Sequence, residues 1–337
     1  MTTPRVLIAG AGPTGLVLAL NLARRGVPLR IIDENAGPGE HSRAMAVQAR
    51  TLEFYRQLGF ADEVIAEGIE VQRIHLRESG RDGRPHQVLE LELKDLGGDI
   101  SPYPFVLTYP QDDHERFLVK KLADAGVTVE RNSKLAGFAQ SDDGLEATVA
   151  GPNGEERISA EYICGCDGAH SVVRQTLGLG FAGGTYDQLY FVCDAKAASG
   201  FERDLYVNIG THTLCLMFPV RSSGMQRLIG LVPPEFSDAD QLTFEDIRAH
   251  VEPLLGTKIS EVNWFSAYRV HHRVAQRFRV GRAFILGDAG HIHSPVGGQG
   301  MNTGIGDATN LGWKLADVLG GCVGPQVLDT YEAERIG

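Results

Sequence analysis

Three glycine-rich segments hold most of the residues whose types and spacing could do chemistry. The first, Gly10-Ala11-Gly12-Pro13-Thr14-Gly15, has the GxGxxG spacing and stands between an expected strand, 6–9, and an expected helix, 13–25. In that context the first glycine makes a tight turn, the second lets the backbone approach a pyrophosphate, and the third lets helix and strand pack closely. The phosphate charge then faces the helix N-terminus. The pattern predicts a dinucleotide site.

A carboxylate at the end of the next expected strand strengthens this interpretation. We expect residues 29–33 to form that strand, with Asp33 as its last residue. An acidic side chain at this place accepts hydrogen bonds from a ribose hydroxyl, and it would repel a 2′-phosphate. The expected nucleotide is therefore an unphosphorylated one, FAD or NAD. The alternative reading is a glycine-rich structural turn with no ligand.

Two further segments repeat the order of strand, glycine loop and helix. Residues 164–174 follow an apolar run, and residues 287–306 follow the apolar run 283–286 and lead into a helix expected over 303–319. Turns alone do not require three such sites in one chain. The simpler readings are a plain turn at Asp167-Gly168 and a helix N-cap at Asp288.

The histidines near the third segment invite a metal interpretation, which we do not adopt. His291 and His293 stand close to Asp288, but no further residue in the sequence presents itself as a partner for such ligands. His170 is expected to start a helix rather than to act as a base. We therefore predict no metal.

Composition limits the classes of partner. The 337 residues carry 32 Lys and Arg against 43 Asp and Glu, a net charge of −11, which disfavours nucleic acid and anionic membranes. No apolar run approaches the ~20 residues of a membrane span, and no signal peptide begins the sequence. Five scattered cysteines without a CxxC pair indicate a reducing cytoplasm. A small-molecule partner fits best.

The alternation of strands and helices predicts an α/β protein that opens with a βαβ unit. Strand-rich stretches at 187–232 and 71–93 interrupt the helical pattern. Further helices are expected over 48–58, 111–125 and 243–254. Further strands are expected over 127–130, 134–140, 145–150, 157–164, 188–195, 204–209, 213–220, 226–232 and 262–270.

The motifs together resemble a known enzyme family. The segments GAGPTG, Ser42-Arg43-Ala44, CDGAHSVVR and GDAGHIHSPVGGQGMNTGIGDATNLGWKLA are similar to those of the class A FAD-dependent aromatic hydroxylases, which share the p-hydroxybenzoate hydroxylase-like fold. Within that class the chain is most similar to the phenol, hydroxyphenylpropionate and aromatic polyketide hydroxylases. The similarity runs over nearly the whole chain, and the last motif is long enough to be specific.

The resemblance implies a flavin-dependent monooxygenase. FAD would occupy the first cleft, and NADPH or NADH would reduce it. O2 would then form a C4a-hydroperoxyflavin, which hydroxylates a phenol-like or polyketide aromatic substrate. The enzyme would be cytoplasmic, would bind neither nucleic acid nor membrane, and could form a homodimer.

The resemblance also implies which residues bind the cofactor. Peptide N–H groups of residues 298–302, at a helix N-terminus, would stabilise negative charge on the flavin. Pro295 would stand with its backbone beside the flavin edge and so takes part in catalysis, and Arg174 would support the second loop. The full cofactor-binding set is Gly10, Gly12, Pro13, Thr14, Gly15, Asp33, Glu34, Arg43, Gln111, Asp167, Gly168, Asp288, Pro295, Gly298, Gly300, Met301 and Asn302.

The base that would remove a phenolic proton stays unknown at this level. Tyr190, Tyr206, His212 and Arg221 lie on the strand-rich stretch and are candidates, although each reads first as a packing or surface residue.

The expected architecture is a Rossmann-type FAD-binding domain interleaved with a β-sheet-rich substrate domain. The FAD-binding domain is expected to comprise residues 1–70, 105–180 and 270–337, and the substrate domain residues 71–104 and 181–269.

The family pattern continues beyond the last residues of the sequence, so a chain without the C-terminal thioredoxin-like domain is expected. Two alternatives to hydroxylation follow. One is an FAD-dependent reductase or oxidase, and the other is a catalytically impaired flavin-binding protein.

Overall fold

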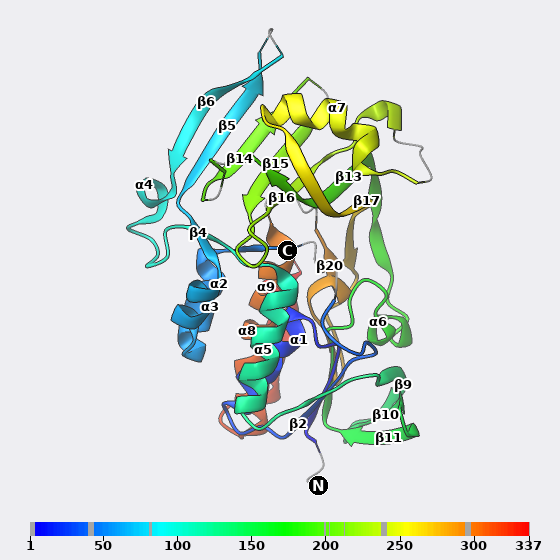
Figure 1. Ribbon diagram of the computed structural model, residues 1–337. Coiled ribbons are helices and arrows are strands. Elements are labelled where there is room, and N and C mark those ends of the chain that lie inside the picture. The colour runs from blue at the N-terminus through cyan, green and yellow to red at the C-terminus, as the bar shows by residue number, and fades with distance from the viewer. Residues whose placement is uncertain are drawn as a thin grey trace. The chain divides into compact units, whose positions relative to one another are not determined.

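The chain divides into two compact units, each built from separate stretches of sequence. The computed structural model describes residues 4–39, 44–80, 83–198, 200–201, 203–211, 213–236, 241–293 and 298–336 (Figure 1). Unit 1 comprises Met1–Ala44, Gln111–Gly184 and His271–Gly337, and unit 2 comprises Met45–Pro110 and Thr185–Val270.

A six-stranded sheet forms the centre of unit 1. Its strands, in spatial order, are β18 (Arg279–Val280), β19 (Ala283–Ile285), β12 (Tyr162–Gly165), β1 (Val6–Ala9), β2 (Leu29–Ile32) and β8 (Val129–Glu130). β1 pairs in parallel with both β2 and β12. Every residue of β1 is buried, as expected for a parallel strand covered on both faces. The predicted βαβ opening is confirmed.

Helices cover this sheet and fix its loops. They are α1 (Pro13–Ala23), α5 (Gln111–Asp124), α6 (Val172–Thr176), α8 (Gln299–Leu319) and α9 (Thr330–Arg335), with 3-10 turns η2 (Gly287–Ala289) and η3 (Pro325–Asp329). α8 packs closely on α1, because a Cβ at Gly312 would meet the Asn21 Cβ at 2.7 Å. Gly312 therefore serves helix packing rather than a ligand.

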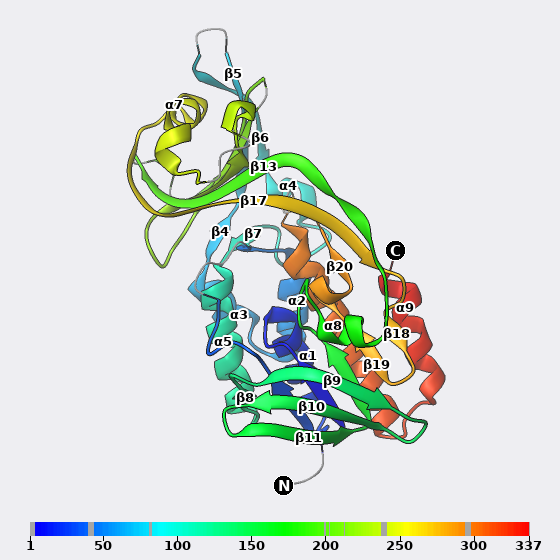
Figure 2. The ribbon, with the colours of Figure 1, turned by 90° about the vertical axis from the view of Figure 1, so that its right-hand side faces the viewer.

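An antiparallel meander forms the second sheet of unit 1 (Figure 2). It consists of β9 (Lys134–Gln140), β10 (Leu145–Gly151) and β11 (Gly154–Ala160). The prediction of one strand over 157–164 was wrong. The chain leaves the meander at Glu161, which pairs with Arg5, and then enters the central sheet as β12. The sequence did not reveal this change of sheet, because the apolar run continues through it.

The last helix, α9, is tied to α8 by a buried cation. Lys314 on α8 is 1% exposed, and its Nζ donates to Oε2 of Glu334 on α9 at 2.7 Å. Asn310 Nδ2 donates to the same oxygen at 2.6 Å. These hydrogen bonds, from Asn310 and then Lys314, lower the pKa of Glu334 from 4.5 to about 2.

Acid should therefore weaken the attachment of α9. A carboxyl whose pKa is lowered by folding stabilises the protein above its unfolded pKa, and that contribution is lost as the pH falls through the folded value. We expect wild type to exceed Glu334→Gln in free energy of unfolding near neutral pH, and the difference to shrink between pH 4.5 and 2. Denaturant titrations across this range measure it. A pH-independent difference would contradict the ion pair.

Unit 2 is built on a large, mostly antiparallel sheet, whose first strand, His291–Ile292, belongs to unit 1. The sheet order is β20 (His291–Ile292), β17 (Ile259–Ala275), β13 (Phe181–Ala197), β16 (Gln226–Leu231), β15 (Leu214–Pro219), β14 (Leu205–Ile209), β5 (Arg73–Ser79) and β6 (Pro85–Glu92). β13 and β17 each contribute residues to both units, and they are longer than the strands expected at 188–195 and 262–270.

Helix α7 (Phe244–Leu255) covers one face of this sheet. Its buried residues, among them Ile247 and Val251, pack with Phe191, Met217 and Leu228. Side chains alternate across a strand, so the intervening residues face the other way. A second, smaller core forms there around Leu205 and Phe218.

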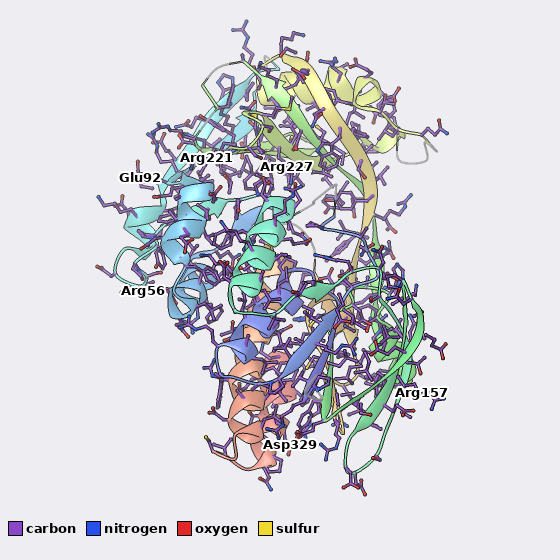
Figure 3. All side chains as sticks on the ribbon, turned by 60° about the horizontal axis from the view of Figure 1, so that its bottom comes forward. Arg56, Glu92, Arg157, Arg221, Arg227 and Asp329 are labelled. Atoms are coloured by element: carbon purple, nitrogen blue, oxygen red, sulfur yellow. The ribbon has the colours of Figure 1, made fainter. Side chains whose placement is uncertain are left out.

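On this second face Asp194 and Arg227 form a buried ion pair. Arg227, labelled in Figure 3, is 4% exposed and Asp194 is 8% exposed. The guanidinium binds the carboxylate through two nitrogens, at 2.7 and 2.8 Å, and Trp264 Nε1 donates to the same carboxylate at 2.9 Å.

The remaining part of unit 2 includes residues that we expected in the FAD-binding domain. β3 (Ala46–Val47), β7 (Val106–Thr108) and β4 (Ile69–Val71) form a small antiparallel sheet. Residues 45–70 and 105–110, which contain these strands, belong to unit 2, whereas we expected them in the FAD-binding domain. The other elements are α2 (Ala49–Leu58), α3 (Ala61–Glu67), α4 (Leu93–Gly97) and η1 (Pro234–Phe236).

The predicted helices 48–58, 111–125 and 243–254 are confirmed as α2, α5 and α7. In the described part of the chain, the helices lack the combination of length and apolarity that a bilayer span requires.

Candidate functional site

The first glycine motif forms a tight loop between β1 and α1. Gly10 has a positive φ of 99°, and its N–H donates to the Ile32 carbonyl at 2.8 Å. A Cβ at Gly10 would meet the backbone of Cys166, and one at Gly15 would meet the Gly10 carbonyl. Glycine at these two positions is required by the protein itself.

Gly12 differs from its neighbours because it faces open space. Among the described residues, a Cβ at Gly12 would meet no atom within 4 Å. Gly12 is also the N-cap of α1, without a side-chain cap and without an acidic residue in the first turn. Pro13 takes the first helical position, where its missing N–H costs nothing. An open glycine before an uncapped helix N-terminus is the arrangement that admits a phosphate.

Asp33 holds this loop in place. Its Oδ2 accepts the Ala11 N–H at 2.6 Å, and its Oδ1 accepts the Asn35 N–H at 2.8 Å. Arg131 lies 3.7 Å from the same carboxylate. Glu34, the neighbouring residue of the predicted set, is exposed and pairs with Lys134 at 2.8 Å. Only Asp33 is thus connected to the glycine loop.

The second motif places a partly satisfied carboxylate beside the first. Oδ2 of Asp167 accepts the Val173 N–H at 3.1 Å, whereas Oδ1 is buried without a hydrogen-bond partner in the described part of the chain. Desolvation raises the pKa of Asp167. Gly168 follows with a φ of 72°, and a Cβ there would meet nothing within 4 Å. A buried carboxylate oxygen that lacks a donor fits a ligand hydroxyl.

Arg174 connects the second motif to the third. Its Nη2 donates to the Ala169 carbonyl and its Nη1 to the Ala289 carbonyl, both at 2.8 Å. The guanidinium also lies 3.9 Å from the centroid of the Phe181 ring. Arg174 therefore supports the loop, as expected from sequence.

The third motif begins with Gly287, whose φ is 57°. A Cβ at Gly287 would lie 2.7 Å from Oγ1 of Thr14, so the predicted residue Thr14 joins the first and third loops by packing. Desolvation by the surrounding chain raises the pKa of Asp288, although the side chain stays accessible to solvent. A hydrogen-bond donor can still reach this carboxylate.

The N-terminus of α8 completes the set. Gly298 is its N-cap with a φ of 61°, and no acidic residue stands in the first turn of this 21-residue helix. Asn302 is buried, and its side-chain Nδ2 donates to the Gly298 carbonyl at 2.7 Å. A Cβ at Gly300 would meet nothing within 4 Å, and Met301 is half-buried. The N–H groups at this helix N-terminus form a second site for negative charge.

The structure brings most of the predicted set together within unit 1. Gly15 adjoins Cys166, Thr14 adjoins Gly287, and Arg174 reaches Ala289, so the three glycine loops are neighbours. Gln111 begins α5, where its N–H donates to the Ala44 carbonyl at 3.1 Å and its side chain to Glu115 at 2.8 Å. Two predicted residues, Arg43 and Pro295, lie outside the described residues.

Three of the candidate bases, Tyr190, Tyr206 and Arg221, lie in the described part of unit 2. Burial raises the pKa of Tyr190, which does not suit a proton acceptor near neutral pH. Tyr206 stacks on His75, with centroids 4.6 Å apart, in the core under α7. Arg221 donates to the carbonyls of Ala66 and Gly68. His212 lies outside the described residues.

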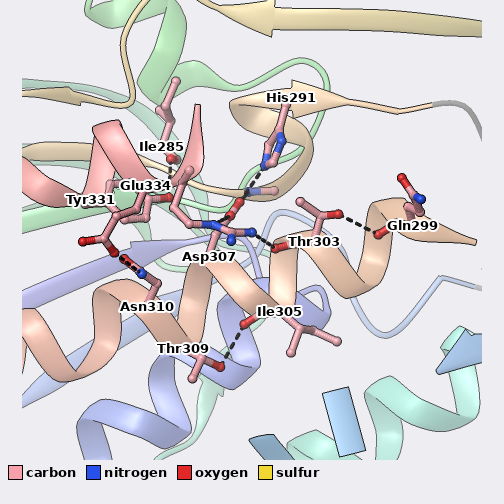
Figure 4. A network of polar contacts seen from close by, with 12 residues as sticks. Ile285, His291, Gln299, Thr303, Ile305, Asp307, Thr309, Asn310, Tyr331 and Glu334 are labelled. Carbon is pink, nitrogen blue, oxygen red and sulfur yellow. Dashed lines mark hydrogen bonds and ion pairs between the residues drawn. The ribbon is translucent and has the colours of Figure 1, made fainter. Parts of the chain in front are cut away.

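Sequence reasoning missed Asp307. This residue of α8 is fully buried, and its carboxylate accepts hydrogen bonds from Gly287 N at 2.9 Å, His291 Nε2 at 2.6 Å and Arg335 Nε at 2.6 Å (Figure 4). The only sequence signal was an acidic residue among the apolar and small residues of a helix. Its partners on other elements could not be read from that signal.

Comparisons with known proteins agree with this site. The family described as FAD binding domain matches residues 3–336. The 6-methylpretetramide 4-monooxygenase of Streptomyces rimosus is 38% identical over 337 residues, which cover 99% of this chain and 59% of that enzyme. The pentachlorophenol 4-monooxygenase of Sphingobium chlorophenolicum is 31% identical, over 98% of this chain and 61% of its own length.

A solved structure shows the same fold. The flavin-dependent monooxygenase PieE, in complex with FAD and substrate, superposes with a TM-score of 0.86 at 27% identity and covers 99% of this chain and 61% of its own. The chain thus spans between 59% and 61% of the length of these three proteins. It belongs to the FAD binding domain family, and its resemblance to the class A FAD-dependent aromatic hydroxylases is confirmed.

Proposed function

We propose that this protein hydroxylates an aromatic compound with NAD(P)H and O2, using FAD as its cofactor. The observation that carries the proposal is the convergence of three glycine loops in unit 1, with an open Gly12 and two uncapped helix N-termini. The activities of the two relatives, monooxygenases acting on a pretetramide and on a chlorophenol, support an aromatic substrate.

The residues present fit FAD. The N-terminus of α1 and the open side of Gly12 would take the pyrophosphate, because helix N-terminal N–H groups attract negative charge and no atom of the described residues lies within 4 Å of a Cβ at Gly12. Asp33 would fix the loop and accept a ribose hydroxyl through its remaining lone pairs. The unpartnered Oδ1 of Asp167 and the accessible carboxylate of Asp288 would accept further hydroxyl groups.

The chemistry that FAD supplies when bound is hydride acceptance from NAD(P)H and activation of O2, with one oxygen atom passing to the ring and the other leaving as water. The chain's own contribution is binding and electrostatics. The N–H groups at the start of α8 would stabilise negative charge on the flavin ring. Arg174 and Asp307 would hold the glycine loops in position through their hydrogen bonds.

We assign FAD binding to unit 1 and substrate binding to unit 2. Val207, Leu216 and Ile229 lie in register on β14, β15 and β16, on the sheet face away from α7, and all three are half-buried. An apolar and partly accessible sheet face suits an aromatic ring.

A cytoplasmic location is part of the proposal. All five cysteines are free, as expected where thiols stay reduced, and NAD(P)H is available in the same compartment. An association of two copies stays a prediction, which light scattering after gel filtration can decide.

The test is to purify the protein, reconstitute it with FAD, and screen phenols and polyketide aromatics for NADPH or NADH consumption and for oxygenated product. We expect a flavin spectrum and a substrate that both stimulates consumption and gains oxygen. Consumption without oxygenated product would favour a reductase or oxidase. A flavin-loaded protein that barely oxidises NAD(P)H would favour the impaired flavin-binding alternative.

A further inference from the structure

Two histidines continue the hydrogen-bond chain that begins at Asp307. His291 Nε2 lies 2.6 Å from Oδ2 of Asp307, and His293 Nε2 lies 2.9 Å from His291 Nδ1. The three side chains form a row, of which Figure 4 shows the segment from Asp307 to His291. Accessibility rises along the row, because Asp307 is 0% exposed, His291 is 5% exposed and His293 is exposed.

The partners of Asp307 fix its role as an acceptor. Oδ1 accepts from Nε of Arg335 and Oδ2 accepts the Gly287 N–H. An aspartate paired with an arginine is a carboxylate, which has lone pairs but no proton to donate. His291 must therefore carry a proton on Nε2.

For a neutral His291 this requirement sets the tautomers of both rings. A neutral His291 with its proton on Nε2 has a lone pair on Nδ1, which must accept from His293. His293 then carries its proton on Nε2 and a lone pair on Nδ1. The outward end of the row is a base.

His293 stands at a place where a base could serve the flavin. In sequence it follows η2, which carries Asp288, and precedes the N-cap of α8 at Gly298. Both flanking elements belong to the cofactor site proposed above.

We propose that Asp307, His291 and His293 form a proton relay that exchanges protons with the FAD site through Nδ1 of His293. The relay rests on the proposed function. His293 is the exchanging group, and Asp307 and His291 are positioning residues.

The transfer balances without an oxidant or reductant. When a proton binds to Nδ1 of His293, the proton on Nε2 of His293 passes to Nδ1 of His291. The positive charge then rests on His291, next to the Asp307 carboxylate, and the reverse sequence releases the proton. No electrons move.

The charged groups around the three side chains support proton acceptance by His293. Desolvation, His291 and Arg335 lower the pKa of His293, while Asp307 raises it, so His293 is a neutral acceptor near neutral pH. Asp288 interacts with His291. Cys166 and Tyr331 also interact with Asp307, but desolvation raises the pKa of both, so they stay neutral.

The first test is nitrogen NMR of histidine-labelled protein, which reports tautomers without activity. We expect both His291 and His293 to carry their protons on Nε2 at neutral pH. In Asp307→Asn the apparent pKa of the histidine pair should fall by about one unit or more, since a neighbouring opposite charge is lost. Glu334→Gln, which removes a carboxylate between α8 and α9 that contacts no histidine, should leave it unchanged. A proton on Nδ1 of His293, or equal pKa values in wild type and Asp307→Asn, would overturn the relay.

The second test keeps the proposal falsifiable if Asp307→Asn does not fold. His293 is exposed, so His293→Gln should fold normally. In the FAD-loaded protein, the yield of oxygenated product per NAD(P)H should change with pH around the pKa of the pair, and this change should vanish in His293→Gln but persist in Glu334→Gln. An unaltered pH profile in His293→Gln would refute the relay. Absence of any oxygenated product from wild type would instead contradict the proposed function, while the NMR result still decides the relay.

Discussion

Replacing Gly12 with valine is expected to abolish FAD retention while the protein stays folded. Gly12 has φ −74° and ψ −178°, a conformation open to any residue, and a Cβ there meets no atom of the described residues within 4 Å. The valine side chain would instead occupy the space assigned to the pyrophosphate. We expect FAD affinity to fall at least about 100-fold, or about 2.8 kcal/mol. Titration of the apoprotein with FAD, followed by flavin fluorescence, measures this.

Gly15→Ala provides the contrast. The added Cβ would overlap the Gly10 carbonyl, so we expect Gly15→Ala to lower the free energy of unfolding through a clash within the protein and not through a lost ligand contact. Gly12→Val should lose no more than about 1 kcal/mol of stability, because valine is a poorer N-cap than glycine. Wild-type FAD affinity in Gly12→Val would refute the placement of the pyrophosphate. Unfolding of Gly12→Val would show that the protein itself fills the space beside Gly12.

Replacing Asp194 with alanine is expected to destabilise unit 2 by about 3–5 kcal/mol, because it leaves the Arg227 guanidinium buried without its partner. Arg227 is 4% exposed, and the lost carboxylate also accepts from the Trp264 indole. Trp264 lies on β17 and so reports on this unit. The chain's other tryptophan, Trp313, can be replaced by phenylalanine to isolate its fluorescence. Urea unfolding followed at Trp264 gives the free energy.

The matched control removes both charges. In Asp194→Leu/Arg227→Met no buried charge is left unpaired, and such replacements are often neutral or stabilising. The double variant should therefore unfold near the wild-type midpoint in urea. A double variant as unstable as Asp194→Ala would mean that lost packing, rather than the stranded charge, causes the effect.

The central strands and the glycine loops could be predicted from sequence because their signals are local. The run Val6–Ala9 is apolar throughout, and the motif after it places glycines where a turn, an open face and a helix contact require them. Asp167 and Asp288 stood out for the same reason, since each follows a strand and begins a loop.

The missed features depend on contacts between distant residues. The change of sheet at Glu161 follows from pairing with Arg5 and from the register of β12 on β1. Asp307 and Arg335 meet only because α9 packs against α8. The extent of β13 and β17 is likewise set by their neighbours in the sheet and not by their own composition. Periodicity within one segment cannot report such partners.

The most direct test of the central claim, that three glycine loops hold one FAD, is a crystal structure of the protein with the cofactor bound. We predict one FAD per chain in an extended conformation, with its pyrophosphate at Gly12 and the N-terminus of α1, hydroxyl groups on Asp167 and Asp288, and its ring at the N-terminus of α8. An FAD that contacts only one of these loops, or that binds elsewhere on the chain, would contradict the account.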